Sequence, residues 1–261
     1  PEFREISHKE WLGGYISNRI TTVSLTLKNE LTWLYNIPED KIDVVKNGGQ
    51  IGKYHKEVDP GRTKERYGIH SMAPVVFFIG RLEYQKGPDL LIKAIPEILE
   101  HRRDVKFLFA GKGGMRDHLE YLAKDLKVGA SFKFLGYLPD EEYLEILNAC
   151  DIVCIPSRNE PFGLVLFEAW DAEKAVVATS VGGLEENIDN FVNGIKVYPH
   201  PESIAWGVKY IINDREGVQE LGKRGKEKLE RSTWPIVANL YEKVYMKALP
   251  EDWNSVEEEK E

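Results

Sequence analysis

From Val75 onward, short apolar runs that suit strands alternate with longer runs that suit helices, and this alternation limits the fold more than any other feature. The predicted strands are 75–79, 105–110, 132–135, 152–155, 175–179 and 195–198. The predicted helices are 88–99, 116–126, 140–148, 163–173, 184–190 and 201–213. Alternation with short loops predicts an α/β domain built on a Rossmann-like, doubly wound parallel sheet with helices on both faces.

Composition excludes several classes of protein. Hydrophobic residues make up 42% of the 261 residues, which is enough for a large core. The net charge of −8 argues against a nucleic-acid-binding surface. Two cysteines, Cys150 and Cys154, are too few for a disulfide framework and are predicted to be buried thiols. The sequence has no apolar run long enough to span a membrane and no signal peptide, so we expect a cytoplasmic protein.

The stretch 156–170 carries the strongest functional signal. It follows a predicted buried strand, contains two prolines that break regular structure, and continues into a helix. The first N–H groups of such a helix have no partner inside it and can hold an anion. Glu160 in the loop and Glu168 in the helix would repel a phosphate, but each carboxylate suits a pair of sugar hydroxyls. A nucleotide-sugar offers two such pairs, one on the sugar and one on the ribose.

The string Pro-Ser-x-x-Glu-Pro-Phe-Gly at residues 156–163, with Glu160 and Glu168 separated by seven residues, resembles the signature of the retaining GT-B glycosyltransferases. That group includes the glycogen and starch synthases and the family 4 (group 1) sugar transferases. The resemblance implies that the chain is the C-terminal half of a GT-B fold. It also implies a nucleotide-sugar donor and a glycan acceptor, with Glu168 on the ribose hydroxyls and Glu160 on the transferred sugar.

Basic side chains and a helix start are expected to hold the donor diphosphate. Arg81 and Lys86 follow the first predicted strand in the family's Gly-Arg-x4-Lys-Gly spacing, and the resemblance assigns them to the diphosphate. Fixed cations there would stabilise the charge that develops on the leaving group. The N–H groups near Gly163 and Leu164, which follow Phe162 at the start of the helix, would add to this site.

Glycine turns end the next two strands. The resemblance places Gly111 and Gly113 near the nucleotide and the base near Gly136 and Tyr137, although simple tight turns explain the same residues. Arg116 replaces the third glycine of a dinucleotide fingerprint, which weakens an oxidoreductase alternative. The sequence has no Asp-x-Asp and no cluster at metal-ligand spacing, so we expect transfer without a metal or other cofactor.

The resemblance also divides the chain. Residues 1–46 would be a remnant of the N-terminal acceptor domain, and 47–233 the Rossmann-like donor domain. A crossing helix would follow at 234–249, and an acidic disordered tail at 250–261. The segment 52–72 is charged and is expected to be an irregular surface connection. The chain begins with proline rather than Met, so we expect a fragment whose full-length protein has the rest of the N-terminal domain.

The predicted function is that of a nucleotide-sugar-dependent retaining glycosyltransferase, glycogen synthase-like, using UDP-glucose or ADP-glucose. A family 4 transferase with another sugar or a lipid-linked acceptor is the alternative within the group. A nucleotide-binding module without catalysis of its own is the alternative from another class, and we expect the isolated fragment to be inactive or weakly active because a GT-B site needs two domains. The mechanistic hypothesis is attack by the acceptor hydroxyl from the face of the leaving group, with a phosphate oxygen taking its proton; a double displacement with Glu160 as covalent nucleophile is the rival.

Overall fold

A computed structural model describes residues 2–249 of the chain, so the predicted tail lies outside the described residues. The chain divides into two compact units. Of the described residues, 49–233 form the large unit, and 2–48 together with 234–249 form the small unit. The described residues include no helix that is both long enough and apolar enough to cross a membrane.

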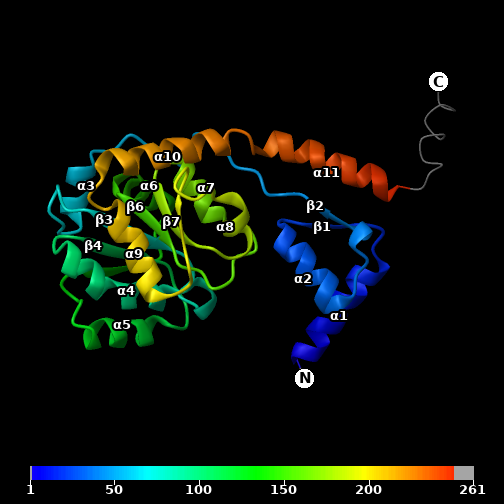
Figure 1. Ribbon diagram of the computed structural model, residues 1–261, viewed down its shortest axis with the longest axis horizontal. Helices are drawn as coiled ribbons and strands as arrows, with labels where there is room; N and C mark the ends of the chain where they lie inside the picture. The colour runs from blue at the N-terminus through cyan, green and yellow to red at the C-terminus, as the bar shows by residue number, and fades with distance from the viewer. Residues whose placement is uncertain (1, 250–261) are drawn as a thin grey trace. The chain divides into compact units, whose positions relative to one another are not determined.

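The large unit is built on one parallel sheet of six strands in the order β5-β4-β3-β6-β7-β8 (Figure 1). The strands are β3 (Val75–Ile79), β4 (Lys106–Ala110), β5 (Phe132–Gly136), β6 (Ile152–Ile155), β7 (Ala175–Thr179) and β8 (Ile195–Val197). The strand order runs outward from β3 in one direction and from β6 in the other, which is the doubly wound arrangement. The predicted fold class is confirmed.

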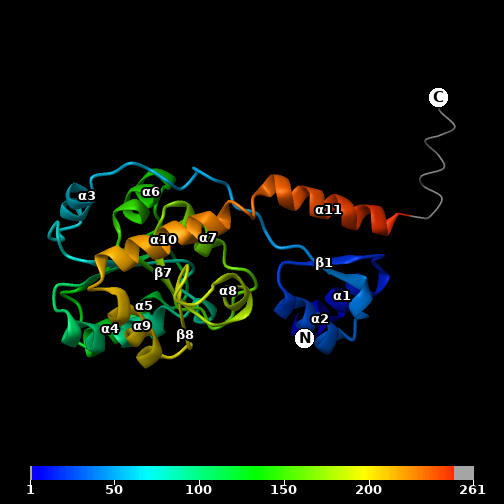
Figure 2. The ribbon, with the colours of Figure 1, turned by 45° about the horizontal axis from the view of Figure 1, so that its top comes forward.

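Helices cover both faces of this sheet, as Figures 1 and 2 show. One face carries α4 (Pro88–His101), which packs against α5 (Arg116–Asp125) and α9 (Pro201–Ile211). The other face carries α6, α7 and α10. Their bounds, with those of the two shorter helices of this unit, are α6 (Asp140–Ala149), α7 (Leu164–Asp171), α10 (Arg215–Leu229), α3 (Pro60–Arg66) and α8 (Gly182–Asn187).

The central strand β3 shows why the predicted strands read as continuous apolar runs. Val76 and Phe78 point to the core shared with α4, α5 and α9, whereas Phe77 packs against Tyr143 of α6 on the other face. Phe77 and Phe78 are both buried, and burying each side chain stabilises the fold by about 1.5–3 kcal/mol. A strand covered on both faces has no solvent side, so its sequence does not alternate with polar residues.

Three helices were not predicted, and one of them corrects an expectation. The segment 52–72 is not irregular throughout, because α3 begins at Pro60 with Asp59 as its N-cap, and the cap side chain accepts from the Arg62 N–H. Proline is well suited to the first turn of a helix, since its missing N–H has no intrahelical partner there. Two other helices were not recognised. The sequence of α1 (Glu2–Ile16) shows little helical periodicity, and half of the buried face of α10 is glycine, which reads as a helix breaker in a sequence.

The small unit joins both ends of the described chain. It contains α1 (Glu2–Ile16), β1 (Ile20–Thr22), α2 (Leu25–Tyr35), a short 3₁₀ turn (Glu39–Lys41), β2 (Ile42–Val44) and α11 (Trp234–Ala248). The strands β1 and β2 pair in parallel. Val237 and Val244 of α11 pack on Val45, and Lys247 binds Asp43 at 2.7 Å, while Leu240 stays 40% exposed. The final helix therefore returns to the segment at the start of the chain.

Candidate functional site

Two loops meet where β3 and β6 lie side by side. Lys86 lies in the loop after β3, and Glu160 in the loop after β6. The Lys86 Nζ donates to Glu160 Oε2 at 2.6 Å, and Ser157 Oγ donates to the same oxygen at 3.2 Å. Glu160 is only 8% exposed. The crossovers leave β3 and β6 in opposite directions, so their carboxyl ends form the crevice in which such sheets bind ligands.

A close backbone approach fixes these two loops against each other. Gly87 has φ +64°, and a Cβ on it would lie 2.0 Å from the Pro156 carbonyl oxygen, so no other residue fits. The Arg158 N–H donates to the Gln85 carbonyl at 2.8 Å. The guanidinium of Arg158 also stacks 3.9 Å from the ring of Tyr84.

An ion pair adds a second connection between these loops. The Arg158 guanidinium binds Asp89 with two parallel hydrogen bonds of 2.8 and 2.7 Å, a geometry that favours ionised partners. Burial raises the pKa of Asp89, but the hydrogen bonds and charge of Arg158 outweigh it and hold that pKa below its usual value. The loop that carries Glu160 is thereby tied to the start of α4.

The glycines after β4 have a structural role that can be read from their contacts. A Cβ on Gly111 would lie 1.9 Å from the Gly80 carbonyl oxygen, and one on Gly113 would lie 2.4 Å from the Leu82 carbonyl oxygen. The Leu82 N–H donates to the carbonyl of Lys112 at 2.9 Å, so the loops after β3 and β4 are bonded together. These glycines allow that approach whether or not a nucleotide lies nearby.

The remaining predicted residues are distributed around the same end of the sheet. Arg81 is exposed and donates to Gln85 at 3.2 Å. Gly136 ends β5 with φ +73°, and Tyr137 is 67% exposed, with the Lys112 ammonium 5.6 Å from its ring.

The start of α7 is held by a neighbouring loop. Gly163 precedes α7 with φ +95°, Phe162 is buried against Phe167, and Leu164 is 51% exposed. The Gly183 N–H donates to the Glu160 carbonyl at 2.8 Å, which places the first residues of α8 directly against this loop. The loop that carries Glu160 and the start of α7 are therefore both packed against the first residues of α8.

Two tyrosines beside Glu168 were not recognised from the sequence. The hydroxyl of Tyr143, on α6, donates to Glu168 Oε2, and the Tyr54 ring lies edge-on to that of Tyr143 with centroids 6.3 Å apart. Burial, followed by the charge of Glu168, raises the pKa of each tyrosine, strongly in the case of Tyr143. No motif could have indicated these contacts, because a lone tyrosine on a predicted helix suggests an ordinary core residue, and Tyr54 lies in a segment that was expected to be an irregular surface connection.

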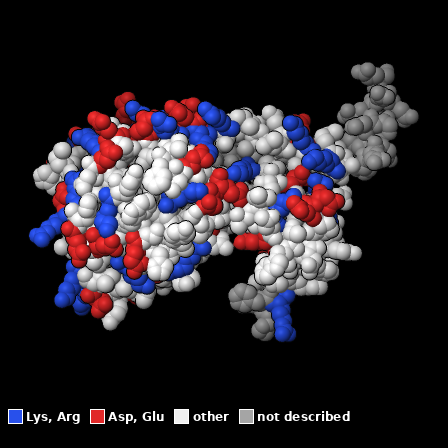
Figure 3. All heavy atoms as spheres, viewed as in Figure 1, with Lys and Arg blue, Asp and Glu red and all other residues white. Residues whose placement is uncertain are grey.

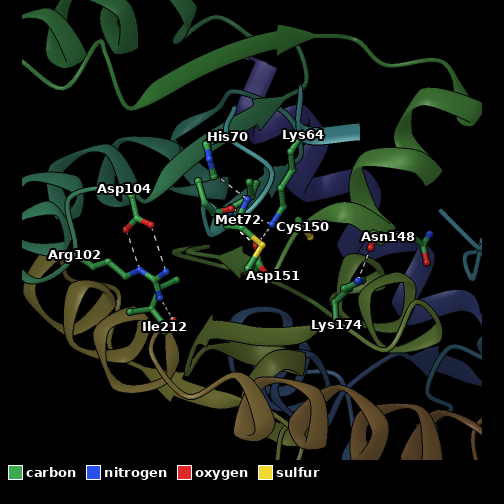
Figure 4. A network of polar contacts seen from close by, with 12 residues as sticks. Lys64, His70, Met72, Arg102, Asp104, Asn148, Cys150, Asp151, Lys174 and Ile212 are labelled. Atoms are coloured by element: carbon green, nitrogen blue, oxygen red, sulfur yellow. Dashed lines mark hydrogen bonds and ion pairs between the residues drawn. The ribbon is translucent and has the colours of Figure 1, made fainter. Parts of the chain in front are cut away.

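Two large hollows lie at the opposite end of the sheet. Two adjoining cavities of about 610 and 530 Å³ share Asn148 and Lys174 as lining residues. Figure 4 shows that polar contacts hold this region: Lys64 binds Asp151 at 2.8 Å just before β6, and Lys174 Nζ donates to the Asn148 carbonyl at 2.6 Å. These side chains close the amino ends of the strands, away from the loops that carry Lys86 and Glu160, so cavity size does not mark the candidate site.

Within residues 2–249, no group of three or more His, Cys, Asp or Glu side chains is arranged to hold a metal ion. Cys150 and Cys154 are both free and buried, as predicted, and burial raises the pKa of Cys150 to about 12. The face shown in Figure 3 carries acidic and basic side chains close together. Elsewhere in the chain, Lys228 pairs with Asp189 at 2.7 Å.

The fold matches a class of solved structures. The crystal structure of Anabaena Alr3699/HepE in complex with UDP and glucose superposes with a TM-score of 0.81 at 23% identity, covering 91% of this chain and 65% of that one. The strand order and the two loops that meet between β3 and β6 therefore define the Rossmann-like half of a GT-B fold.

Sequence comparison narrows this class to a family. The profile described as "Glycosyl transferases group 1" matches residues 61–228, more than half of the chain. The uncharacterized glycosyltransferase MJ1607 of Methanocaldococcus jannaschii is 39% identical over 255 residues, which cover 94% of this chain and 64% of that protein. The chain belongs to the group 1 glycosyl transferases.

More distant relatives carry two different names. The D-inositol 3-phosphate glycosyltransferase of Corynebacterium kroppenstedtii is 29% identical, over 95% of this chain and 57% of that protein. The glycogen synthase of Mycobacterium tuberculosis is 27% identical, over 92% of this chain and 60% of that protein. The chain thus spans between about half and two thirds of the length of these relatives.

Proposed function

We propose that the chain is the donor-binding part of a retaining glycosyltransferase, which moves a sugar, with glucose as first candidate, from a nucleotide-sugar to a glycan acceptor in the manner of a glycogen synthase. The observation that carries this proposal is the contact between Lys86 and Glu160 at the crevice of the sheet. It puts a cation suited to a diphosphate beside a carboxylate suited to sugar hydroxyls. A nucleotide-sugar presents these two groups next to each other.

The residues divide the work as follows. An ammonium has three donors, and Lys86 uses one on Glu160, which leaves two for phosphate oxygens. Arg81, exposed in the same loop, adds a second cation, and the first N–H groups of α7 after Gly163 add a helix end. Glu160 accepts from hydroxyls of the transferred sugar and steadies positive charge at its anomeric carbon. Together they stabilise the separation of charge as the glycosidic bond breaks.

The geometry of Glu160 bears on the choice of mechanism. Its Oε2 accepts from both Lys86 and Ser157, and the residue is nearly buried. Two hydrogen bonds occupy one oxygen of this carboxylate and fix its position, so the side chain is less free to move onto the anomeric carbon. We therefore propose attack by the acceptor hydroxyl from the face of the leaving group, with a donor phosphate oxygen taking the proton. A sugar trapped covalently on Glu160 would contradict this.

The identity of the acceptor separates two proposals within the family. One relative is named an inositol 3-phosphate glycosyltransferase at an identity close to that of the relative named a glycogen synthase. A family 4 transferase acting on another acceptor is therefore the alternative proposal. Adding a purified N-terminal part and offering glycogen or a cyclitol phosphate with the same donor separates the two, because only one acceptor gains labelled sugar.

Calorimetric titration of the chain with UDP and ADP tests the donor site directly. We expect Arg81→Ala and Glu168→Ala each to weaken the preferred nucleotide by about 10- to 100-fold, the value of one hydrogen bond to a charged group. Arg224→Ala is the control, because this exposed arginine on α10 pairs with Glu220 in its own helix and contacts none of the predicted site residues. A folded chain that binds neither nucleotide, or that binds NADH instead, contradicts the proposal.

A further inference from the structure

We propose that Tyr143 and Tyr54 are positioning residues of the nucleotide site, which hold the carboxylate of Glu168 in one orientation for the ribose hydroxyls. The inference rests on the proposed function, since it assumes that Glu168 faces a nucleotide. It goes beyond that function because it adds two elements to the ribose site. These are α6, which carries Tyr143, and the segment 49–58 before α3, which carries Tyr54.

The contact of Tyr143 with Glu168 is fixed by packing. Tyr143 extends from α6, its ring lies 6.3 Å from that of Phe77 in the central strand, and its hydroxyl donates to Glu168 Oε2. Because burial and the neighbouring carboxylate raise its pKa, the phenol stays protonated and remains a donor at neutral pH. The hydrogen bond thus has a constant direction, from the tyrosine to Oε2.

The segment that carries Tyr54 is held rigidly onto the sheet unit. Asp171, which is completely buried, accepts from the Gly52 N–H at 2.7 Å and from the Tyr54 N–H at 2.6 Å. Asn148 donates to the Tyr54 carbonyl at 2.8 Å and accepts from the Lys56 N–H at 3.2 Å. Four hydrogen bonds to two side chains therefore fix the backbone on both sides of Tyr54 and hold its ring against Tyr143.

The chemical consequence is preorganisation. A glutamate side chain free to rotate would lose entropy when a ligand fixed it, and a carboxylate already fixed avoids part of that cost. Each carboxylate oxygen can accept two hydrogen bonds, so Glu168 can bind ribose hydroxyls while Tyr143 donates to its Oε2. Glu168 then accepts the ribose in one defined geometry, so its contribution to binding depends on a hydroxyl that never touches the nucleotide.

The test compares ribose with deoxyribose. The chain is titrated by calorimetry with UDP and ADP and with their 2′-deoxy counterparts. We expect Tyr143→Phe to weaken the preferred nucleotide by about tenfold and to leave its 2′-deoxy form nearly unchanged. We expect Glu168→Gln to reduce the same preference, and Tyr143→Phe to add little in that background, because residues acting through one contact are not additive.

The matched control is Tyr67→Phe, which removes a hydroxyl from another half-buried tyrosine of the same unit. Equal weakening of both forms by Tyr143→Phe would overturn the inference, because it would show a general structural effect. Unchanged binding of both forms would also overturn it, while leaving the proposed function intact. A wild-type chain that binds no nucleotide would instead contradict the proposed function itself.

Discussion

Removal of the Lys86 ammonium, with a methionine in place of lysine, should reveal how much the fold depends on pairing Glu160. The variant leaves a carboxylate that is 10% exposed without its cation, while Ser157 keeps one hydrogen bond to it. Breaking a fully buried pair costs about 3–5 kcal/mol. The Lys86 side chain is 24% exposed, so water reaches the site and we expect a loss of about 2 kcal/mol in the free energy of unfolding.

Urea unfolding at neutral pH measures this loss, and the fluorescence of the fully buried Trp170 in the same unit reports it. Lys209→Met is the matched control. Lys209 is 26% exposed, close to Lys86, but its partner Glu97 is 41% exposed, so the carboxylate left behind is hydrated. We expect this control to cost less than about 1 kcal/mol.

A double variant distinguishes the cost of the unpaired Glu160 charge from the cost of replacing the Lys86 side chain. Adding Glu160→Gln to Lys86→Met removes the unpaired charge, and we expect at least half of the lost stability to return. The reasoning would be refuted if Lys86→Met cost no more than Lys209→Met. It would also be refuted if the double variant were less stable than Lys86→Met alone.

Three further outcomes follow from other contacts. Asp89→Asn should destabilise the chain at pH 7. Because folding lowers the pKa of Asp89, its contribution to stability is complete above pH 3.8 and is lost as the pH falls below that value. The difference in unfolding free energy between wild type and variant, measured by urea unfolding, should therefore be smaller at pH 3 than at pH 7. Gly113→Ala should lower the thermal midpoint clearly, whereas Gly129→Ala, whose Cβ would meet nothing within 4 Å, should not. Cys150 should resist a thiol reagent at pH 8 until urea unfolds the chain, and rapid labelling of the native chain would contradict its burial.

Much of the fold could be predicted from local sequence. The runs 75–79, 152–155 and 175–179 were predicted with the bounds that the structure gives, because a buried parallel strand needs an unbroken apolar run. The helix α1 was missed because its helical periodicity is weak, and α10 because Gly222 and Gly225 form part of its buried face.

The candidate site was predicted only in part, and the reason is the distance along the chain between its members. Lys86 and Glu160 each follow a predicted strand, so a parallel sheet places both at the same edge, but only the strand order makes their strands neighbours. Their contact joins residues 74 positions apart.

What the sequence by itself determined is the alternation of strands and helices from Val75 to α9, the loop ends that carry charged side chains, and the resemblance to a family. What only the tertiary structure decided is which of those groups touch. Tyr143 and Tyr54 reach Glu168 because α6 and the segment 49–58 pack beside α7, and no local pattern encodes that packing. Periodicity reports which face of an element is apolar, whereas the partner of a polar side chain depends on how distant elements meet.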